Sequence, residues 1–270
     1  MRPSPLVDAL AEAEFGGKAA SLARSLRAGL PVPPGFALSS PHVEAVFAGH
    51  TEALEYLRTE FTELAGPCAV RSSAIGEDSE QASFAGQHVT ILNVRHEDHV
   101  AGAVLKVRES AYAESARAYR RTLGMDNEPR VAVVVQRMIE PDCAGVMFTK
   151  NPLNGANERV IEASWGLGEA VVAGLVVPDN YGLDEQGRVL RRTAGQKDVA
   201  LLSGPDGGTV EEGVADDLVT ALCLTDDMLS RLHDLAERCE SFFGAGLDIE
   251  WAFARNVLYL LQCRAMTRNR

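Results

Sequence analysis

Three short stretches of this 270-residue sequence combine cationic, glycine and metal-ligating residues in patterns suited to an anionic ligand. In the first, residues 16–21 (GGKAAS), Lys18 follows two glycines at the start of a helix predicted over 17–29. Backbone N–H groups at a helix start attract an anion, and a lysine adds a point charge. The stretch is not a Walker A motif, because Glu12 stands where that motif requires glycine. An exposed lysine in a turn explains the pattern equally well.

The second stretch runs from a predicted buried strand over 68–73 into a glycine-containing loop over 74–88. Arg71 lies near the end of the strand, where its planar guanidinium could donate a fork of hydrogen bonds to phosphate oxygens. The loop could close over a polyphosphate and exclude water. The alternative is a local ion pair of Arg71 with Glu77 or Asp78.

The third stretch is a pair of strands predicted over 247–253 and 257–266. Strand alternation puts Asp248 and Glu250 on one face, and Gln262 and Arg264 on one face. Such groups are costly among apolar residues unless they bind a ligand, and carboxylate and amide oxygens suit Mg²⁺. All four side chains share a face only if the register pairs 248 with 262, which requires an odd-length loop. The alternative is a buried Glu–Arg ion pair that only fixes the hairpin.

Composition excludes several classes of partner. The formal net charge is −12 and the pI is about 5.0, which argues against nucleic acid and anionic membranes. No run approaches the roughly 18 apolar residues of a membrane span, and the acidic N-terminus does not resemble a signal peptide. Five cysteines without a CxxC pair fit a reducing compartment, so we expect a cytoplasmic protein. No nucleophile elbow surrounds Ser72 or Ser73, which argues against triad hydrolase chemistry.

The elements that must position these residues indicate a mixed α+β (α/β) fold. The second half of the chain is richer in short β-branched strands, so we place one lobe at 1–130 and another at 131–270. We expect 203–213 to form a surface loop. The remaining predicted helices and strands are helices over 51–64, 98–121 and before residue 244, and strands over 131–138, 144–149 and 158–164.

In this order the stretches resemble the N-terminal nucleotide-binding domain of the phosphoenolpyruvate synthase / pyruvate phosphate dikinase family, which includes rifampicin phosphotransferases. The resemblance covers nearly the whole chain and rests on five blocks: GGKAASLARSLRAGLPVPPGFALSS, AVRSSAIGEDSEQASFAGQHVTILNV, VVVQRMIEPDCAGVMFTKNPLNG, VIEASWGLGEAVVAGLVVPDNYGLD and DIEWAFARNVLYLLQCRAMT.

This resemblance implies an ATP-grasp fold with ATP bound between two lobes, and an ATP-dependent phosphotransferase with Mg²⁺ as its cofactor. It also implies a role for each matching residue. Lys18 and Arg71 would hold phosphates, Gly86 and Thr90 would belong to the loop over the triphosphate, and Gln136 would lie at the adenine-binding hinge. Glu250 and Gln262 would bind magnesium, with Asp248 as a possible second acid, and Arg264 would contact the transferring phosphates.

Relatives of full length carry a swivelling domain in which the histidine of a Ser-His motif accepts a phosphoryl group. None of the six histidines here follows a serine, and the chain ends soon after the third stretch. We therefore expect the ATP-binding component of a dikinase-like enzyme, which passes a phosphoryl group to a histidine on a separate or removed domain. In relatives the β-phosphoryl group moves, and AMP and phosphate result. The alternatives are a stand-alone kinase that phosphorylates a small molecule directly and a non-catalytic ATP-binding module.

Overall fold

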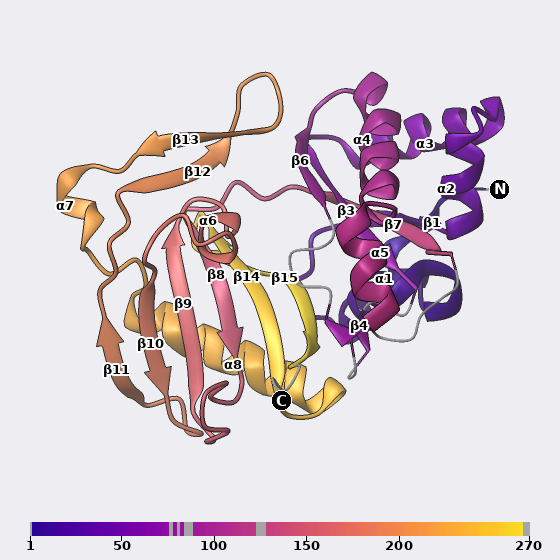
Figure 1. Cartoon of the computed structure of the whole chain (residues 1–270). Coiled ribbons are helices and arrows are strands. Elements are labelled where there is room, and N and C mark those ends of the chain that lie inside the picture. Colours follow the sequence, from indigo (N-terminus) through magenta and orange to yellow (C-terminus); the bar gives the residue numbers. More distant parts are fainter. Residues whose placement is uncertain (1, 76–77, 80–81, 84–88, 123–127, 267–270) are drawn as a thin grey trace. The chain divides into compact units, whose positions relative to one another are not determined.

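The computed structural model describes residues 2–75, 78–79, 82–83, 89–122 and 128–266. The chain divides into two compact units (Figure 1). The first comprises Met1–Arg27, Pro33–Met138 and Pro205–Gly208, and the second comprises Ala28–Val32, Ile139–Gly204 and Thr209–Arg270.

The described part of the first unit forms an antiparallel sheet in the order β1-β2-β7-β3-β6. Its strands are β1 (Ser4–Pro5), β2 (Gly35–Leu38), β3 (Cys68–Ala74), β6 (Thr90–Val94) and β7 (Val131–Arg137), and β4 (Asp78–Ser79) pairs separately with β5 (Ala82–Ser83). The helices are the 3₁₀ helix η1 (Leu6–Asp8), α1 (Glu12–Arg27), α2 (Ser40–Phe47), α3 (Thr51–Leu64), α4 (Glu97–Ser110) and α5 (Glu114–Thr122).

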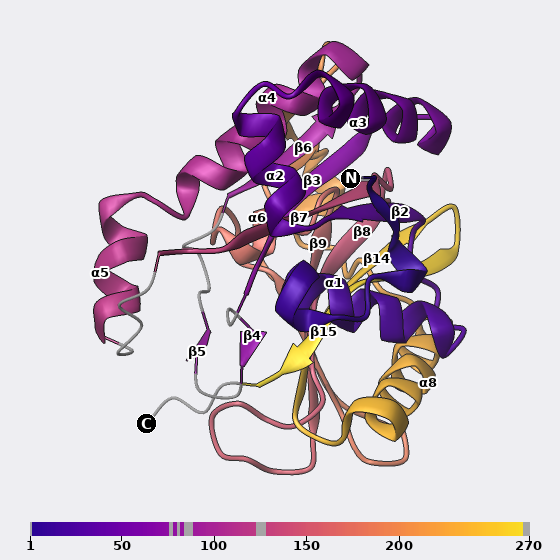
Figure 2. The same ribbon diagram turned by 90° about the vertical axis from the view of Figure 1, so that its right-hand side faces the viewer.

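Alternation along the strands gives this sheet two different faces. One face is apolar and forms a core with α2, α3 and α4, through residues such as Val70, Val133, Leu57 and Val104. Helix α1 contacts β3 and β7 on the opposite face (Figure 2). The first unit therefore has a packed apolar side and a second side covered in part by α1.

Strand β7 lies in the first unit, although we placed it at the start of the second lobe. It lies between β2 and β3, where Val135 pairs with Phe36 and with Val70. Residues 131–136 are all buried, as expected for a central strand with an element on each face. The change in composition at residue 131 therefore marks the start of a central strand of the first unit's sheet, and not a boundary between lobes.

Two other expectations about elements are wrong. The helix expected over 98–121 is two helices, α4 and α5, because the apolar stripe of α4 does not continue into the charged sequence of α5. The surface loop expected over 203–213 contributes to a hairpin of β12 (Val199–Ser203) and β13 (Thr209–Gly213). Every residue of β13 is exposed, so no burial pattern in the sequence reveals this strand.

The described part of the second unit is an antiparallel sheet in the order β11-β10-β9-β8-β14-β15, with α8 across one face (Figure 1). That face is largely apolar and includes Ile249 and Trp251, which are fully buried. The remaining elements are β8 (Cys143–Phe148), β9 (Arg159–Trp165), α6 (Glu169–Val172), β10 (Asp179–Leu183), β11 (Val189–Thr193), α7 (Asp216–Val219), α8 (Asp226–Phe243), β14 (Leu247–Ala254) and β15 (Val257–Ala265).

Within the described ranges, no helix has the length and apolar character needed to cross a membrane.

Candidate functional site

Three of the predicted site residues share one face of the first unit's sheet. Arg71 of β3 pairs with Thr90 of β6 and with Val134 of β7, and Gln136 of β7 pairs with Ala69 of β3. Directly paired residues lie on the same side of a sheet, as do residues two apart in one strand. Arg71, Thr90 and Gln136 therefore lie on the face that α1 covers in part.

Arg71 and Gln136 contact each other on this face. A guanidinium N–H of Arg71 donates a long hydrogen bond of 3.5 Å to Oε1 of Gln136, and Nε2 of Gln136 donates to the carbonyl of Pro33 at 3.2 Å. Both side chains are buried. The side chains of Glu77 and Asp78, the alternative partners of Arg71, lie outside the described residues, as does Gly86. Gln136 thus connects the arginine to the segment before β2.

Lys18 lies on α1, just after a break in that helix. Gly16 has φ 77° and ψ 168°, a backbone region that is essentially restricted to glycine. A Cβ at Gly16 would lie 1.8 Å from the carbonyl oxygen of Ser73, so only glycine permits this approach to β3. Lys18 is half-buried two residues further on. Gly16 thus lets the segment that carries Lys18 approach the strand that carries Arg71.

In the second unit, the four predicted residues of the hairpin share one face. Asp248 pairs with Arg264, and Glu250 pairs with Gln262. The shared face was expected only if 248 paired with 262 across an odd-length loop, and that condition is wrong, because the face is shared without either. The turn has two central residues, Arg255 and Asn256, both with positive φ, as in a type I′ turn.

A β-bulge provides the extra residue that the turn does not. The register shifts between Glu250 and Trp251, so that Trp251 pairs with Leu260 while Glu250 pairs with Gln262. Leu260 consequently faces the apolar side with Trp251, and Gln262 faces the opposite side with Glu250. Bulges commonly redirect side chains next to functional sites. Strict alternation along β15 would have placed Leu260 and Gln262 on the same face.

Arg264 forms an ion pair with Asp248. Its Nε and Nη2 donate to Oδ2 of Asp248 at 2.9 and 2.7 Å, and both side chains are largely buried. The alternative prediction was a buried ion pair between an arginine and a glutamate of this hairpin. The ion pair described here joins Arg264 to an aspartate, Asp248. Opposite Gln262, which is 5% exposed, the half-buried Glu250 presents a carboxylate beside an amide.

Sequence reasoning missed Glu162 on this same face. Glu162 of β9 pairs with Val146 of β8, and Val146 pairs with Glu250 of β14. The three residues form one row across the sheet, and all are half-buried. A charged residue inside the apolar strand 158–164 is the same signal that identified Glu250.

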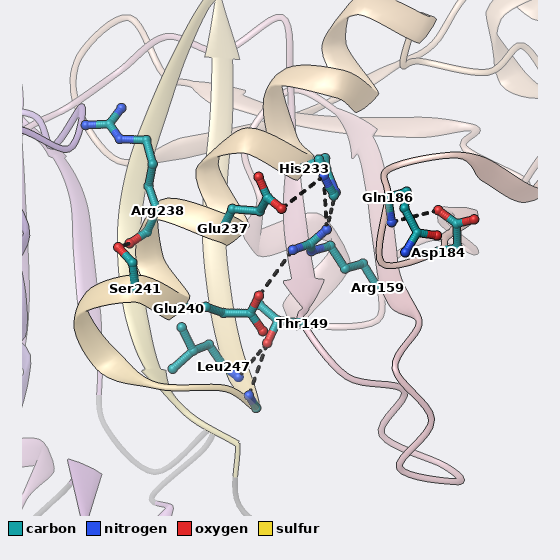
Figure 3. Close-up of polar contacts among 11 residues, drawn as sticks. Thr149, Arg159, Asp184, Gln186, His233, Glu237, Arg238, Glu240, Ser241 and Leu247 are labelled. Atoms are coloured by element: carbon teal, nitrogen blue, oxygen red, sulfur yellow. Dashed lines mark hydrogen bonds and ion pairs between the residues drawn. The ribbon is translucent and has the colours of Figure 1, made fainter.

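A polar cluster on the other face of the sheet anchors α8, which leads into β14 (Figure 3). The guanidinium of Arg159 contacts the ring of His233 and donates to Glu240 at 3.1 Å. Burial and the adjacent guanidinium lower the pKa of His233. Thr149 accepts hydrogen bonds from the amides of Gly246 and Leu247, immediately before Asp248. These contacts fix the start of the strand that carries Asp248 and Glu250.

Comparisons with known proteins identify the family to which the chain is similar. Residues 44–270 match the family model described as "Pyruvate phosphate dikinase, AMP/ATP-binding domain". The chain is 32% identical over 93% of its length to a "Probable phosphoenolpyruvate synthase" of Methanothermobacter thermautotrophicus, of which it covers 44%. It is 37% identical over 94% of its length to "Prodigiosin synthesizing transferase PigC" of Serratia marcescens, and 37% identical over 74% to a "Rifampicin phosphotransferase" of Bacillus subtilis. It spans 31% and 23% of those two relatives.

Among solved structures, the chain is similar to the "dinucleotide forming Acetyl-coenzyme A synthetase 1" of Ca. Korarchaeum cryptofilum. The TM-score is 0.50 at 13% identity, and the match covers 94% of each chain. At this identity the similarity concerns the fold alone, and it confirms the predicted mixed α+β fold of the ATP-grasp class.

Proposed function

This chain belongs to the family of pyruvate phosphate dikinase AMP/ATP-binding domains, and we propose that it is the Mg-ATP-binding component of a phosphotransferase. In this proposal it passes a phosphoryl group from ATP to a histidine on a swivelling domain or on a separate protein. ATP binding is supported by the family itself. The magnesium ion, the histidine acceptor and the role of each residue are the proposal's own content.

The register of the β14–β15 hairpin is the observation that carries the proposal. It places Glu250 and Gln262 opposite each other on one face, next to the pair of Asp248 and Arg264. A carboxylate and an amide are hard oxygen donors of the kind that Mg²⁺ takes alongside phosphate oxygens and water. The donor set therefore fits magnesium, which Glu250 and Gln262 would hold. When bound, the ion would neutralise phosphate charge.

The other residues have roles that follow from their charge and contacts. Phosphoryl transfer requires mainly positioning of the phosphates and stabilisation of their charge. Lys18 and Arg71 would supply cationic donors to phosphate oxygens from the first unit. Arg264 would do so from the second, with its guanidinium oriented by two hydrogen bonds to Asp248. Gln136 and Thr90 share a sheet face with Arg71, where they would contact the adenine side and the phosphate side of the nucleotide.

Calorimetric titration of the whole chain with ATP, with magnesium or with EDTA, tests the binding part of the proposal. Lys18→Ala and Arg71→Ala should each weaken Mg-ATP binding by about 10- to 100-fold, because a hydrogen bond to a charged group is worth about 1.5–3 kcal/mol. Glu250→Ala should remove the magnesium dependence while the chain stays folded. Matched controls are Lys106→Ala on α4 and Glu212→Ala on β13, both exposed. A folded chain that does not bind ATP would refute the proposal, and unfolding of Glu250→Ala would assign that residue a structural role.

Product analysis tests the transfer step. The chain, Mg-ATP and a histidine-bearing swivelling-domain protein should together yield AMP, phosphate and a phosphorylated histidine, with one water molecule consumed to release the phosphate. Phosphorylation of a small molecule by the chain alone would instead establish the stand-alone kinase and overturn the histidine route.

A further inference from the structure

We propose that Ser73 is a positioning residue for nucleotide binding, whose hydroxyl fixes the turn that carries Lys18 against the strand that carries Arg71. The inference rests on the proposed function, because it assigns Ser73 an effect that passes through Lys18. Ser73 is then the residue that links the stretch containing Lys18 to the stretch containing Arg71.

The hydroxyl of Ser73 bridges the two sides of the turn. Its Oγ donates to the carbonyl of Phe15 at 2.6 Å and accepts from the amide of Ala19 at 2.9 Å. Residues 16–18 lie between these two partners. A serine hydroxyl has one proton and two lone pairs, so a single side chain can hold both ends of the turn.

The turn needs an external partner because Gly16 interrupts α1. The backbone of Gly16, with φ 77° and ψ 168°, is not helical, and the amide of Ala19 belongs to the first turn of the helical segment that follows. Amides in a first helical turn have no partner within the helix. Such groups are usually capped by the residue just before the helix. Here the capping oxygen comes from a different element, β3.

Strand β3 makes this a link between the two proposed phosphate contacts. Ser73 and Arg71 are two residues apart in β3, so they lie on the same face, and both are buried, at 1% and 9% exposure. The strand is paired with β7 along its whole length, where Ser73 lies opposite Ala132, and with β6 as far as Arg71. Ser73 therefore sets the position of the Lys18 turn relative to Arg71 through a rigid strand. Without the hydroxyl, the sheet remains and the turn loses its fixed position.

The test is a double-mutant cycle on the whole chain, measured as the dissociation constant for Mg-ATP by calorimetry. Ser73→Ala should weaken binding by about fivefold, the equivalent of one neutral hydrogen bond. In the Lys18→Ala background it should cause no further loss, because its effect passes through that lysine. Ser73→Thr, which keeps the hydroxyl, should restore binding. The matched control is Ser25→Ala, a buried serine of α1 whose hydroxyl has no hydrogen-bond partner among the described residues.

A second measurement does not depend on the nucleotide. Hydrogen exchange at the amide of Ala19 should be faster in Ser73→Ala than in the unmodified chain, and unchanged in Ser25→Ala. Unchanged exchange in Ser73→Ala, or equal loss of affinity with and without Lys18, would overturn the inference and leave the proposed function intact. A chain that binds no Mg-ATP would refute the proposed function, even where the exchange result confirms the cap. An unaltered affinity in Lys18→Ala would overturn both the assignment of Lys18 and the inference.

Discussion

Replacing Lys197 by methionine should destabilise the second unit by about 3 kcal/mol. Its ammonium contacts the carboxylate of Asp179, and both side chains are fully buried, at 0% exposure. The same carboxylate accepts hydrogen bonds from the amides of Gly195 and Cys223, each at 2.8 Å, and from the hydroxyl of Tyr181 at 3.3 Å. Asp179 therefore holds three segments of the second unit together around one buried charge.

The magnitude follows from what each substitution leaves behind. Removing one partner of a buried ion pair costs about 3–5 kcal/mol, because the other charge remains buried. Methionine has nearly the length of lysine, so Lys197→Met leaves no large cavity, and three neutral donors still stabilise Asp179. This places the loss at the lower end of the range. Asp179→Asn removes the charge beside the buried ammonium and turns amide protons toward backbone donors. Each donor left unsatisfied adds about 1–3 kcal/mol, so the loss should exceed that of Lys197→Met.

Urea unfolding followed by circular dichroism measures both losses. Lys106→Met on the exposed face of α4 serves as the control and should change stability by less than about 0.5 kcal/mol. The midpoint for Lys197→Met should fall while the m-value stays constant, since the surface exposed on unfolding is the same. A loss below about 1 kcal/mol for Lys197→Met, or a larger loss for it than for Asp179→Asn, would refute this reasoning.

Two further predictions concern backbone strain and pH. Gly16→Ala should destabilise the chain by at least about 1–3 kcal/mol, because φ 77° disfavours alanine and the new Cβ would lie 1.8 Å from the carbonyl oxygen of Ser73. Thermal unfolding should instead show a gain in stability for Gly102→Ala, which adds a methyl group in open space on α4. We expect this substitution to stabilise the chain by about 0.5–1 kcal/mol. The lowered pKa of folded His233 means that the unfolded chain binds a proton more readily, so stability should fall as the pH drops below the ordinary histidine value of 6.5. His233→Gln should reduce that fall when the unfolding free energy is measured between pH 7.5 and roughly pH 5, and an identical pH dependence would contradict the contribution of this histidine.

The sequence allowed good predictions where residue type and local spacing decide the outcome. The family, the fold class, the helix over 51–64 and the strands that carry Arg71, Gln136 and Glu250 follow from motifs and hydrophobic alternation. The helix and the strands are each encoded within a few consecutive residues, and the family follows from five sequence blocks in a fixed order. The lobe to which β7 belongs is not encoded locally, because it depends on pairing with β2 and β3, which are distant in sequence.

The hairpin shows why register was the weakest part of the prediction. Whether Gln262 lies beside Glu250 or on the opposite face depends on a single extra residue in β15. A type I′ turn and a bulge together have the effect of the odd-length loop that we expected a shared face to require, and no residue type in the stretch reveals the bulge. The role of Ser73 was missed for a related reason. Its partners, Phe15 and Ala19, lie more than 50 residues earlier in the chain, so no local motif joins them to Ser73.

The charges of the two units assign them different parts of the proposed function. In the first unit, the predicted phosphate contacts are cations, Lys18 and Arg71. In the second, the row of the sheet that holds Glu250 also holds Glu162, and the guanidinium of Arg264 is paired with Asp248. On that face, β9 and β14 therefore carry three carboxylates, those of Glu162, Asp248 and Glu250, and the edge strand β15 carries the guanidinium of Arg264. Such a surface repels a free triphosphate and attracts a divalent cation. Within the proposed function, the charge of this face is therefore a second reason to expect a magnesium requirement, besides the proposed ligation by Glu250 and Gln262.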